Sequence, residues 1–386
     1  MVLVLPALLL LGLGVLELVL RARGGQVLGV GLESRHMFSL DAQGRLRPEP
    51  GWTGALSGES GTVPVRLSDF GLRGPDLGPP APGQRRVLVL GDSFVFGLGE
   101  REEHTLPAQL QARLRDAGGG DVVVGNAGMI GTGLPEQVDR LEQLLEPGPD
   151  GRPAFGPDLV VACLFLGNDF VDDEHLPWAV VEGYRFPAPV MRQIASPGRF
   201  RRALRWQVAA LAEKWLIDHL PQHAMLGSPF VPPAPGSRLL LPSGADRAEG
   251  FFVDARAPTP AVEAALARVS LAWERLAAVA GDVPVLLVLV PTRFHLDEPT
   301  WVDGLRAHGL EPAAYRFGAT QQRLTLLAAG LGLPLVDLTP ALADADGAGE
   351  AYQQGLMHWT PVGAAAAADA LAPHVRTRLE GVADDG

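Results

Sequence analysis

The sequence predicts an α/β fold in which a parallel β-sheet carries helices on both faces. Short apolar runs alternate along the chain with longer stretches whose apolar residues recur every three or four positions. Parallel strands need a crossover connection, usually a helix, so this alternation is typical of a parallel sheet between two helical layers. The chain can build a large core, because 47% of its 386 residues are apolar and 20% are charged.

The predicted strands and helices lie between residues 87 and 379. Strands are expected at 87–90, 122–124, 159–166, 283–290 and 333–338, each a short run rich in apolar residues. Helices are expected at 104–116, 134–145, 261–280, 319–330 and 361–379, where apolar residues recur at helical spacing. Together they predict a three-layer α/β/α domain around a five-stranded parallel sheet.

The chain divides into an N-terminal anchor at 1–23, a lead-in at 24–84 and a main domain at 85–386. The lead-in holds a few short strand-like runs and a stretch rich in glycine and proline, so we expect irregular structure that packs on the main domain. Residues 170–260 do not fit the alternation. We expect an insertion or lid there, with an amphipathic helix at 200–220 that carries Trp206 and Trp215.

The first residues indicate a membrane anchor. Residues 2–20 are almost entirely apolar, and nineteen helical residues rise about 28 Å, close to the thickness of the hydrocarbon core. A basic leader and a small-residue cleavage site are both missing, which favours a retained single-pass helix over a cleaved signal peptide. The alternative is a helix buried in the globular domain. Arg21 and Arg23 follow the apolar run, and the positive-inside rule taken literally would keep them cytoplasmic, so the charges leave the topology open.

Charge and cysteine content exclude several classes of protein. The net charge of −12 argues against nucleic acid as a partner, because nucleic-acid binders carry a basic face. The single cysteine, Cys163, cannot form an internal disulfide. The sequence has no Walker-type phosphate loop and no Cys/His cluster of the zinc type. The acidic run at 172–175 is typical of a solvated loop, so we expect neither a cofactor nor a metal.

Polar residues suited to acyl transfer follow the predicted strands. In an open parallel sheet, ligands bind beyond the carboxyl ends of the strands. Those ends carry Gly91-Asp92-Ser93-Phe94, the block 126–131 with Asn126 and Gly131, and Gly167-Asn168-Asp169, while His358 precedes the last helix. A hydroxyl nucleophile, oxyanion donors and an imidazole base are the groups that acyl transfer needs.

Each of these residues also has a structural interpretation. Ser93 would suit the cap of the helix that follows the first strand. Asn168 and Gly131 are residue types common in turns. His358 would be a histidine at the start of a helix with no catalytic duty. The four blocks together, in order and at the predicted strand ends, favour the catalytic interpretation.

The four blocks resemble those of the SGNH (GDSL-type) hydrolase superfamily over residues 66–380, with the insertion unmatched. The resemblance implies a flavodoxin-like fold, Ser93 as nucleophile and His358 as general base. It also implies an oxyanion hole formed by the backbone N–H groups of Ser93 and Gly131 and by the Asn168 amide. The apolar N-terminus, the segment 68–74, residues 291–293 and residues 358–363 are similar, more specifically, to anchored SGNH proteins of the alginate O-acetyltransferase type.

One departure from the family pattern concerns the acid of the triad. The family usually places an aspartate two or three residues before the histidine, where this chain has Leu356 and Gly355. Among acids elsewhere we take Asp337, at the end of the fifth strand, as the first candidate, with Asp344, Asp346 and Glu350 as others. A backbone carbonyl that holds the histidine Nδ1 proton would instead give a Ser–His dyad.

The resemblance implies a serine acyl-ester hydrolase or O-acyltransferase acting on O-acetyl groups of a surface glycan. It also implies a single-pass membrane protein with an extracytoplasmic catalytic domain. Two alternatives follow from particular features. The missing acid is consistent with a non-catalytic protein that binds glycans or assists assembly. The anchor and the apolar insertion are consistent with a lipase at the membrane surface.

Overall fold

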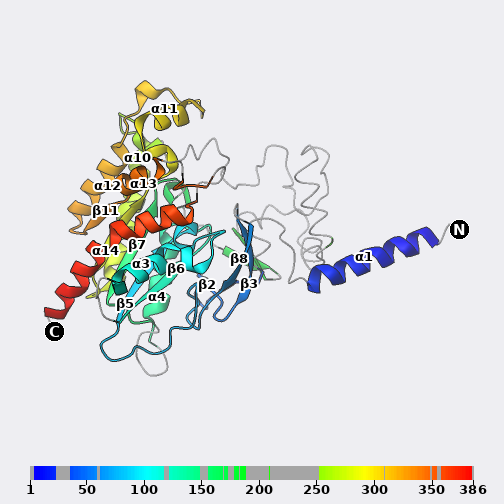
Figure 1. The fold of residues 1–386 in the computed structure, drawn as a ribbon. Helices are drawn as coiled ribbons and strands as arrows, with labels where there is room; N and C mark the ends of the chain where they lie inside the picture. The colour runs from blue at the N-terminus through cyan, green and yellow to red at the C-terminus, as the bar shows by residue number, and fades with distance from the viewer. Residues whose placement is uncertain are drawn as a thin grey trace.

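The computed structural model of the chain is shown in Figure 1. It describes residues 4–22, 35–58, 61–116, 121–147, 155–167, 169–172, 178–181, 183–187, 208, 252–307, 309–347, 350–353 and 358–384.

The centre of the fold is a five-stranded sheet in which every pair of neighbouring strands is parallel. Its strands are β5 (Arg85–Gly91), β6 (Val122–Gly128), β7 (Leu159–Phe165), β10 (Val285–Val290) and β11 (Leu335–Asp337). They lie in the order β11-β10-β7-β5-β6. The strand order therefore reverses beside β5, as in flavodoxin-like folds, where ligands bind at that reversal. The five-stranded parallel sheet predicted from the sequence is confirmed.

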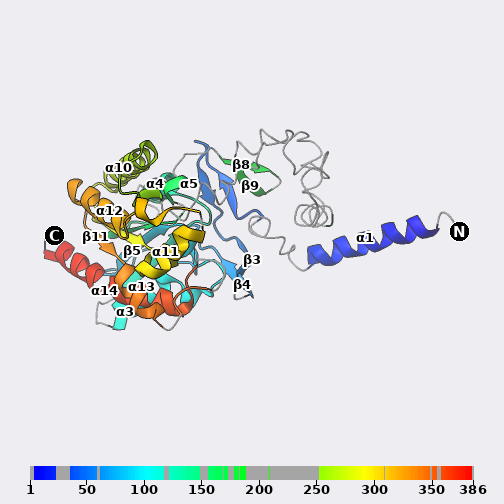
Figure 2. The same ribbon diagram turned by 90° about the horizontal axis from the view of Figure 1, so that it is seen from above.

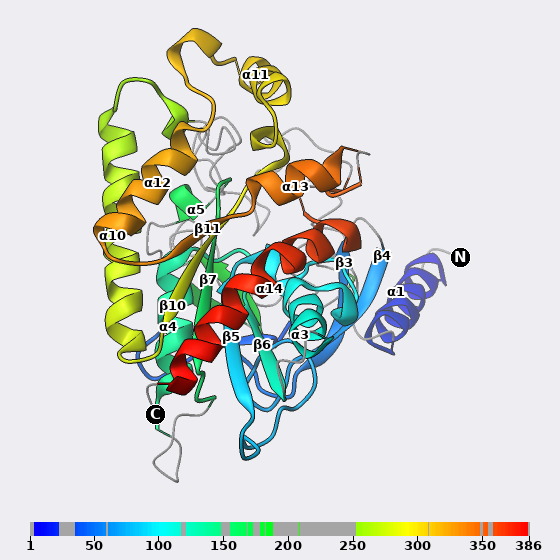
Figure 3. The same cartoon turned by 60° about the vertical axis from the view of Figure 1, so that its left-hand side comes forward.

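Helices cover both faces of the sheet. One face packs against α3 (Leu106–Asp116), α13 (Thr339–Asp346) and α14 (Pro361–Asp384), and the other against α4 (Leu134–Leu145), α10 (Pro260–Ala280) and α12 (Ala319–Gly330). Figure 2 and Figure 3 show these two groups on opposite sides of the strands. Along β5, Val87 and Val89 belong to one core and Leu88 and Leu90 to the other, because successive side chains of a strand point to opposite faces.

The shorter elements connect this scaffold. They are α2 (Ser93–Phe96), η1 (Glu102–His104), α5 (Asp169–Asp172), η4 (Arg293–His295), α11 (Glu298–Ala307) and η5 (Pro312–Ala314). The helices predicted at 134–145 and 319–330 have those bounds in the structure. The strand predicted at 122–124 was too short, because β6 continues to Gly128 through pairing with β5.

The lead-in forms hairpins where irregular structure was expected. Strands β1 (Phe38–Leu40) and β2 (Leu46–Pro48) pair, and so do β3 (Thr53–Gly58) and β4 (Gly61–Arg66). Their buried side chains share one core with Phe96, Met129 and Ile130, which follow β5 and β6. The lead-in therefore packs directly on the loops at the carboxyl ends of these strands. A third hairpin, β8 (Trp178–Val181) with β9 (Tyr184–Pro187), lies nearby and contacts β1.

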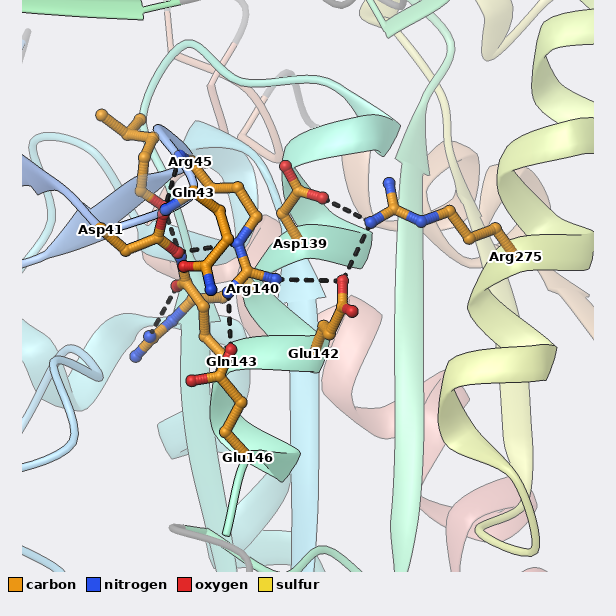
Figure 4. A network of polar contacts seen from close by, with 10 residues as sticks. Asp41, Gln43, Arg45, Asp139, Arg140, Glu142, Gln143, Glu146 and Arg275 are labelled. Atoms are coloured by element: carbon orange, nitrogen blue, oxygen red, sulfur yellow. Dashed lines mark hydrogen bonds and ion pairs between the residues drawn. The ribbon is translucent and has the colours of Figure 1, made fainter. Parts of the chain in front are cut away.

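Polar side chains tie the lead-in to the helical layer, as Figure 4 shows. Arg45 lies within 3.1 Å of Glu142 and 2.6 Å of Glu146, both on α4. On the other side of α4, Arg275 of α10 pairs with Glu142 at 3.0 Å and with Asp139 at 2.6 Å. The lead-in, α4 and α10 thus share one network of charges.

The N-terminal helix α1 spans Val4–Ala22, and its residues Leu10, Leu11 and Leu18 are exposed. Among the described residues, no helix combines the length and hydropathy needed to cross a bilayer. The transmembrane helix predicted at 1–23 is therefore not supported by the structure. Most of the predicted insertion at 170–260, including the predicted helix with Trp206 and Trp215, lies outside the described residues.

Candidate active site

Ser93 lies in a tight turn between β5 and α2. The Asp92 side chain caps the helix by accepting a hydrogen bond from the Phe94 N–H at 2.9 Å, so Asp92 has a structural role. Ser93 is the first residue of α2, and its N–H has no acceptor within the helix. A Cβ at Gly91 would lie 2.3 Å from Val95 Cγ2, so only glycine lets α2 fold back this closely on the strand.

His358 contacts Ser93 from the far end of the chain. Its Nε2 lies 2.8 Å from Ser93 Oγ, which is hydrogen-bond distance. The imidazole packs on Phe94, with ring centroids 5.0 Å apart, and Phe94 in turn packs edge-on against Trp359. The structure thus brings together the nucleophile and the base that the sequence predicted.

The surroundings of His358 keep its imidazole neutral. Burial lowers its pKa from 6.5 to about 4, because an apolar site disfavours the charged form. At neutral pH the ring therefore has a free lone pair. With Nε2 facing the serine hydroxyl, Nε2 is the acceptor and the proton belongs on Nδ1.

The predicted oxyanion block, residues 126–131, begins in the last residues of β6 and continues beyond the strand. The Met129 N–H donates to the Gly91 carbonyl at 3.0 Å, and a Cβ at Gly128 would lie 2.1 Å from the Phe96 nitrogen. The block therefore packs closely against the helix that carries the nucleophile. Gly131, the last residue of the block, is exposed and has a φ of 63°, a conformation that suits glycine. Asn168, the predicted third donor, lies outside the described residues.

Asp337 was the wrong choice for the acid of the triad. Its Oδ1 accepts hydrogen bonds from the N–H and the hydroxyl of Thr339, at 2.9 and 2.6 Å, and so stabilises the start of α13. It lies on β11, which β10 and β7 separate from the Ser93 strand β5. Within the described part of the chain, His358 has no hydrogen bond to a carboxylate. Leu356 and Gly355 lie outside that part.

Asp346, another candidate acid, also has structural partners, and Glu350 has a main-chain contact. Asp346 Oδ2 lies 3.3 Å from Arg293 Nε, and its Oδ1 accepts from the Ala351 N–H at 3.1 Å. The Glu350 carbonyl accepts a hydrogen bond from the Thr360 hydroxyl. These contacts hold the segment that precedes His358 without reaching the imidazole.

Arg73 supports the site, and the sequence analysis assigned it no role. Its guanidinium donates to the carbonyls of Phe96, Gly97 and Glu100, which form the turn after α2. Burial lowers the pKa of Arg73 to about 10, so the side chain remains charged at neutral pH. The sequence signal was an arginine between Leu72 and Gly74 in the lead-in, but its partners lie more than twenty positions away.

The space beside the catalytic pair is narrow. A pocket of about 10 Å³, enough for roughly one water molecule, lies next to Ser93 and His358. Its other lining residues are Phe94, Gly97, Leu98, Glu100, His104, Thr105, Leu106, Trp359 and Ala364. In the ranges that the structure describes, no group of three or more His, Cys, Asp or Glu residues could hold a metal ion.

A serine and a neutral histidine in contact at the carboxyl edge of a parallel sheet form a site for nucleophilic acyl transfer. Residues 248–386 match the family model of the SGNH hydrolase-like domain of acetyltransferase AlgX. The resemblance seen in the sequence is thereby confirmed for this part of the chain, and the match supports an esterase or acyltransferase. It includes His358, whereas Ser93, Gly131 and Asn168 lie before it.

Solved structures of similar proteins include several hydrolases. The lipase/acylhydrolase from Enterococcus faecalis is 15% identical, with a TM-score of 0.38, over 76% of this chain and 96% of that one. AlinE4, an SGNH-hydrolase family esterase, is 15% identical, with a TM-score of 0.34, over 79% of this chain and 98% of its own. TesA is 18% identical, with a TM-score of 0.34, over 76% of this chain and 99% of the TesA chain. No curated protein matches the chain.

Proposed function

We propose that this chain is a serine acyl-ester hydrolase or O-acyltransferase, with Ser93 as nucleophile and His358 as general base. The observation that carries the proposal is the 2.8 Å contact between Ser93 Oγ and His358 Nε2. Nucleophile and base within hydrogen-bond reach are the geometric requirement for this chemistry. The low pKa of His358 supports the same roles, because only the neutral ring can accept the serine proton.

The reaction proceeds in two acyl transfers. His358 Nε2 takes the proton from Ser93 Oγ as that oxygen attacks the ester carbonyl carbon. The imidazolium then gives this proton to the leaving alcohol as the ester C–O bond breaks, which leaves an acyl group on Ser93. In the second transfer, a water or sugar hydroxyl loses its proton to His358 and attacks the acyl carbon. Ser93 is released with its proton restored, and the product is a free acid or a new ester.

Backbone donors around the nucleophile would stabilise the tetrahedral oxyanion. The Ser93 N–H is available at the start of α2, and Gly131 lies on the exposed loop after β6. Asn168 remains a predicted third donor. Removal of a single oxyanion donor typically costs about 3 kcal/mol of transition-state stabilisation.

Hydrolysis of p-nitrophenyl acetate by the full-length protein tests the proposal. Ser93→Ala and His358→Gln should each lower kcat/KM by at least about 10³-fold, because loss of either member disables the pair. Ser270→Ala is the matched control, since Ser270 bonds Glu274 on the surface of α10 and should not affect turnover. Full activity of Ser93→Ala would contradict the proposal.

We propose an O-acetyl group as the acyl group and a glycan hydroxyl as its acceptor. The support is the similarity of residues 248–386 to a domain of acetyltransferase AlgX and the narrowness of the pocket beside Ser93. Esters of longer acids should therefore react more slowly than acetate esters. A series of p-nitrophenyl esters measures this, and a preference for long chains would instead favour a lipase.

We also propose that the N-terminal helix attaches the chain to a membrane, with the catalytic domain outside the cytoplasm. The support is the exposure of Leu10, Leu11 and Leu18 on α1, since clustered exposed leucines favour an apolar surrounding. Flotation with lipid vesicles tests the attachment. Replacement of these three leucines by serine should release the chain from the vesicles, and unchanged flotation would contradict the proposal.

The second candidate function is a non-catalytic glycan-binding protein. It is motivated by His358, which has no carboxylate partner among the residues that the structure describes. A binding protein would retain glycan affinity in Ser93→Ala and would show no Ser93-dependent turnover on any ester.

A further inference from the structure

Gln353 makes two hydrogen bonds to the main chain around His358. The Gln353 N–H donates to the His358 carbonyl at 2.9 Å, and its side-chain Nε2 donates to the Trp359 carbonyl at 3.1 Å. Tyr352 and Trp359 form a bridge beside this pair. A single glutamine therefore fixes the main chain of His358, through its N–H, and of the next residue, Trp359, through its side chain.

Glu100 holds the Gln353 side chain from the other side of the site. Its Oε1 accepts a hydrogen bond from Gln353 Nε2 at 2.7 Å, and both residues are buried. The two amide hydrogens of Gln353 are thus directed at two acceptors, the Glu100 carboxylate and the Trp359 carbonyl. Because both partners offer an oxygen that accepts, the amide is satisfied only when its Nε2, and not its oxygen, faces them.

Glu100 lies in the same loop region as Ser93, a few residues after the helix α2 that begins with Ser93. It follows α2 in the turn whose carbonyls Arg73 binds, and its own carbonyl is one of them. It also lines the pocket that contains Ser93 and His358, with His104 Nδ1 at 3.8 Å from its Oε2. The contact between Glu100 and Gln353 consequently joins the segment that carries the nucleophile to the segment that carries the base.

We infer that Glu100 is a positioning residue for the Ser93–His358 pair and acts through Gln353. The inference rests on the proposed function. In a standard triad, a carboxylate orients the imidazole by direct contact at Nδ1. Here the carboxylate holds the Gln353 amide against the Trp359 carbonyl, next to the histidine in the chain, and so sets the distance between Oγ and Nε2. The residue that does part of the work of the missing aspartate thus comes from the nucleophile loop.

Four substitutions test this inference by steady-state hydrolysis of p-nitrophenyl acetate. Glu100→Ala and Gln353→Ala should lower kcat by about 10- to 100-fold at similar KM, since a displacement of about 1 Å has effects of this size. Glu100→Gln can still offer an oxygen to Gln353 and should stay within a few-fold of wild type. Gln353→Glu has nearly the same shape but sets a carboxylate against two acceptors, so it should be as impaired as Gln353→Ala.

Gln143 provides the matched control. Its Nε2 also donates to a carboxylate and a main-chain carbonyl, those of Asp41 at 3.0 Å and Leu46 at 3.1 Å, in the network of Figure 4. Gln143→Ala should lower the free energy of unfolding about as much as Gln353→Ala and leave kcat unchanged. Urea unfolding of each variant separates loss of fold from loss of positioning.

The outcomes are distinct. Turnover that depends on Ser93 but stays within twofold of wild type in Glu100→Ala and Gln353→Ala would overturn the inference and leave the proposed function intact. Equal activity of Gln353→Glu and wild type would also overturn it, because shape alone would then suffice. Absence of Ser93-dependent turnover in the wild-type chain would defeat the proposed function and this inference together.

Discussion

His358 is buried against Phe94, which in turn packs on Trp359, and these apolar surroundings control how it titrates. They lower its pKa to about 4, whereas a triad carboxylate would favour the protonated ring and raise it. A base of such low pKa is weak, but it is almost fully in its reactive form across the neutral range. We therefore expect a site that tolerates acid and has modest rates.

This expectation can be checked by the pH dependence of kcat/KM. The rate follows the neutral fraction of His358, so it should rise with pH through about 4 and be flat above about 5. At pH 5 about 90% of the plateau rate should remain, compared with about 3% for a histidine of pKa 6.5. The measurement is ester hydrolysis from pH 3 to 8, with Ser270→Ala as the control. An acid limb near pH 6.5 would indicate a solvated imidazole, and a limb above pH 6.5 would indicate a negative charge beside His358.

Single residues differ in how well the sequence predicts them. Ser93 and His358 lie at a strand end and a helix start, and the family pattern includes both, so they could be found. The choice of Asp337 as the triad acid was wrong. It rested on an acid at a strand end, and that pattern does not tell how far the strand lies from β5 in the sheet. Glu100 and Gln353 carried no signal, since their contact joins positions 253 residues apart.

Among the secondary-structure elements, α2 depends on close approach to the ends of β5 and β6. Glycine at positions 91 and 128 makes this approach feasible, and Arg73 holds the turn that follows. The prediction of β6 stopped at Val124 because Gly125 and Asn126 interrupt the apolar run. The lead-in hairpins escaped prediction for a related reason, because their short strands are half exposed and rich in glycine and proline.

Substitution of Gly128 tests the close approach of α2. In Gly128→Ala the new methyl group would lie 2.1 Å from a main-chain nitrogen, so α2 must move and carry Ser93 with it. We expect a loss of kcat of more than about 100-fold, together with destabilisation of the order of 1–3 kcal/mol. Circular dichroism melts and ester hydrolysis would measure both.

Gly330 is the control for that substitution. It ends α12, has no atom within 4 Å of an added Cβ, and has no positive φ. Gly330→Ala should be neutral or slightly stabilising. If Gly128→Ala behaved like Gly330→Ala, the packing of α2 on β6 would not matter for the site.

For the whole molecule, a buried polar network around Asp254 links segments that the sheet does not connect. Asp254 accepts hydrogen bonds from Trp301 Nε1 at 2.8 Å and from the N–H and hydroxyl of Thr320, and its Oδ2 lies 3.2 Å from His295 Nε2. Burial alone would raise the pKa of Asp254. The hydrogen bond and charge of His295, with the Thr320 donors, lower it instead.

Asp254→Asn should therefore destabilise the fold in a pH-dependent way. A carboxyl with a lowered folded pKa stabilises the protein above its unfolded value of 3.8, and this stability is lost as the pH falls through the folded value. At pH 7 we expect the free energy of unfolding to fall by about 3 kcal/mol. The asparagine amide must point its own N–H donors at groups that are themselves donors. The difference from wild type should shrink below pH 3.8 in urea unfolding curves.

Asp303→Asn is the comparison for that experiment, since Asp303 is exposed and pairs only loosely with Arg306. It should leave the unfolding midpoint nearly unchanged at every pH. An Asp254→Asn curve that coincides with it would rule out a stabilising role for the network.

The distance along the chain between the proposed nucleophile and base has a consequence for biosynthesis. Ser93 and His358 are 265 positions apart, and β7, β10 and β11 are all made between them. During translation the nucleophile turn leaves the ribosome long before its base exists. A nascent chain can assemble much of the sheet and still be inert toward esters until the final helix docks. Esterase activity would thus appear abruptly, once the segment that carries His358 has docked beside Ser93, and would report that step during synthesis.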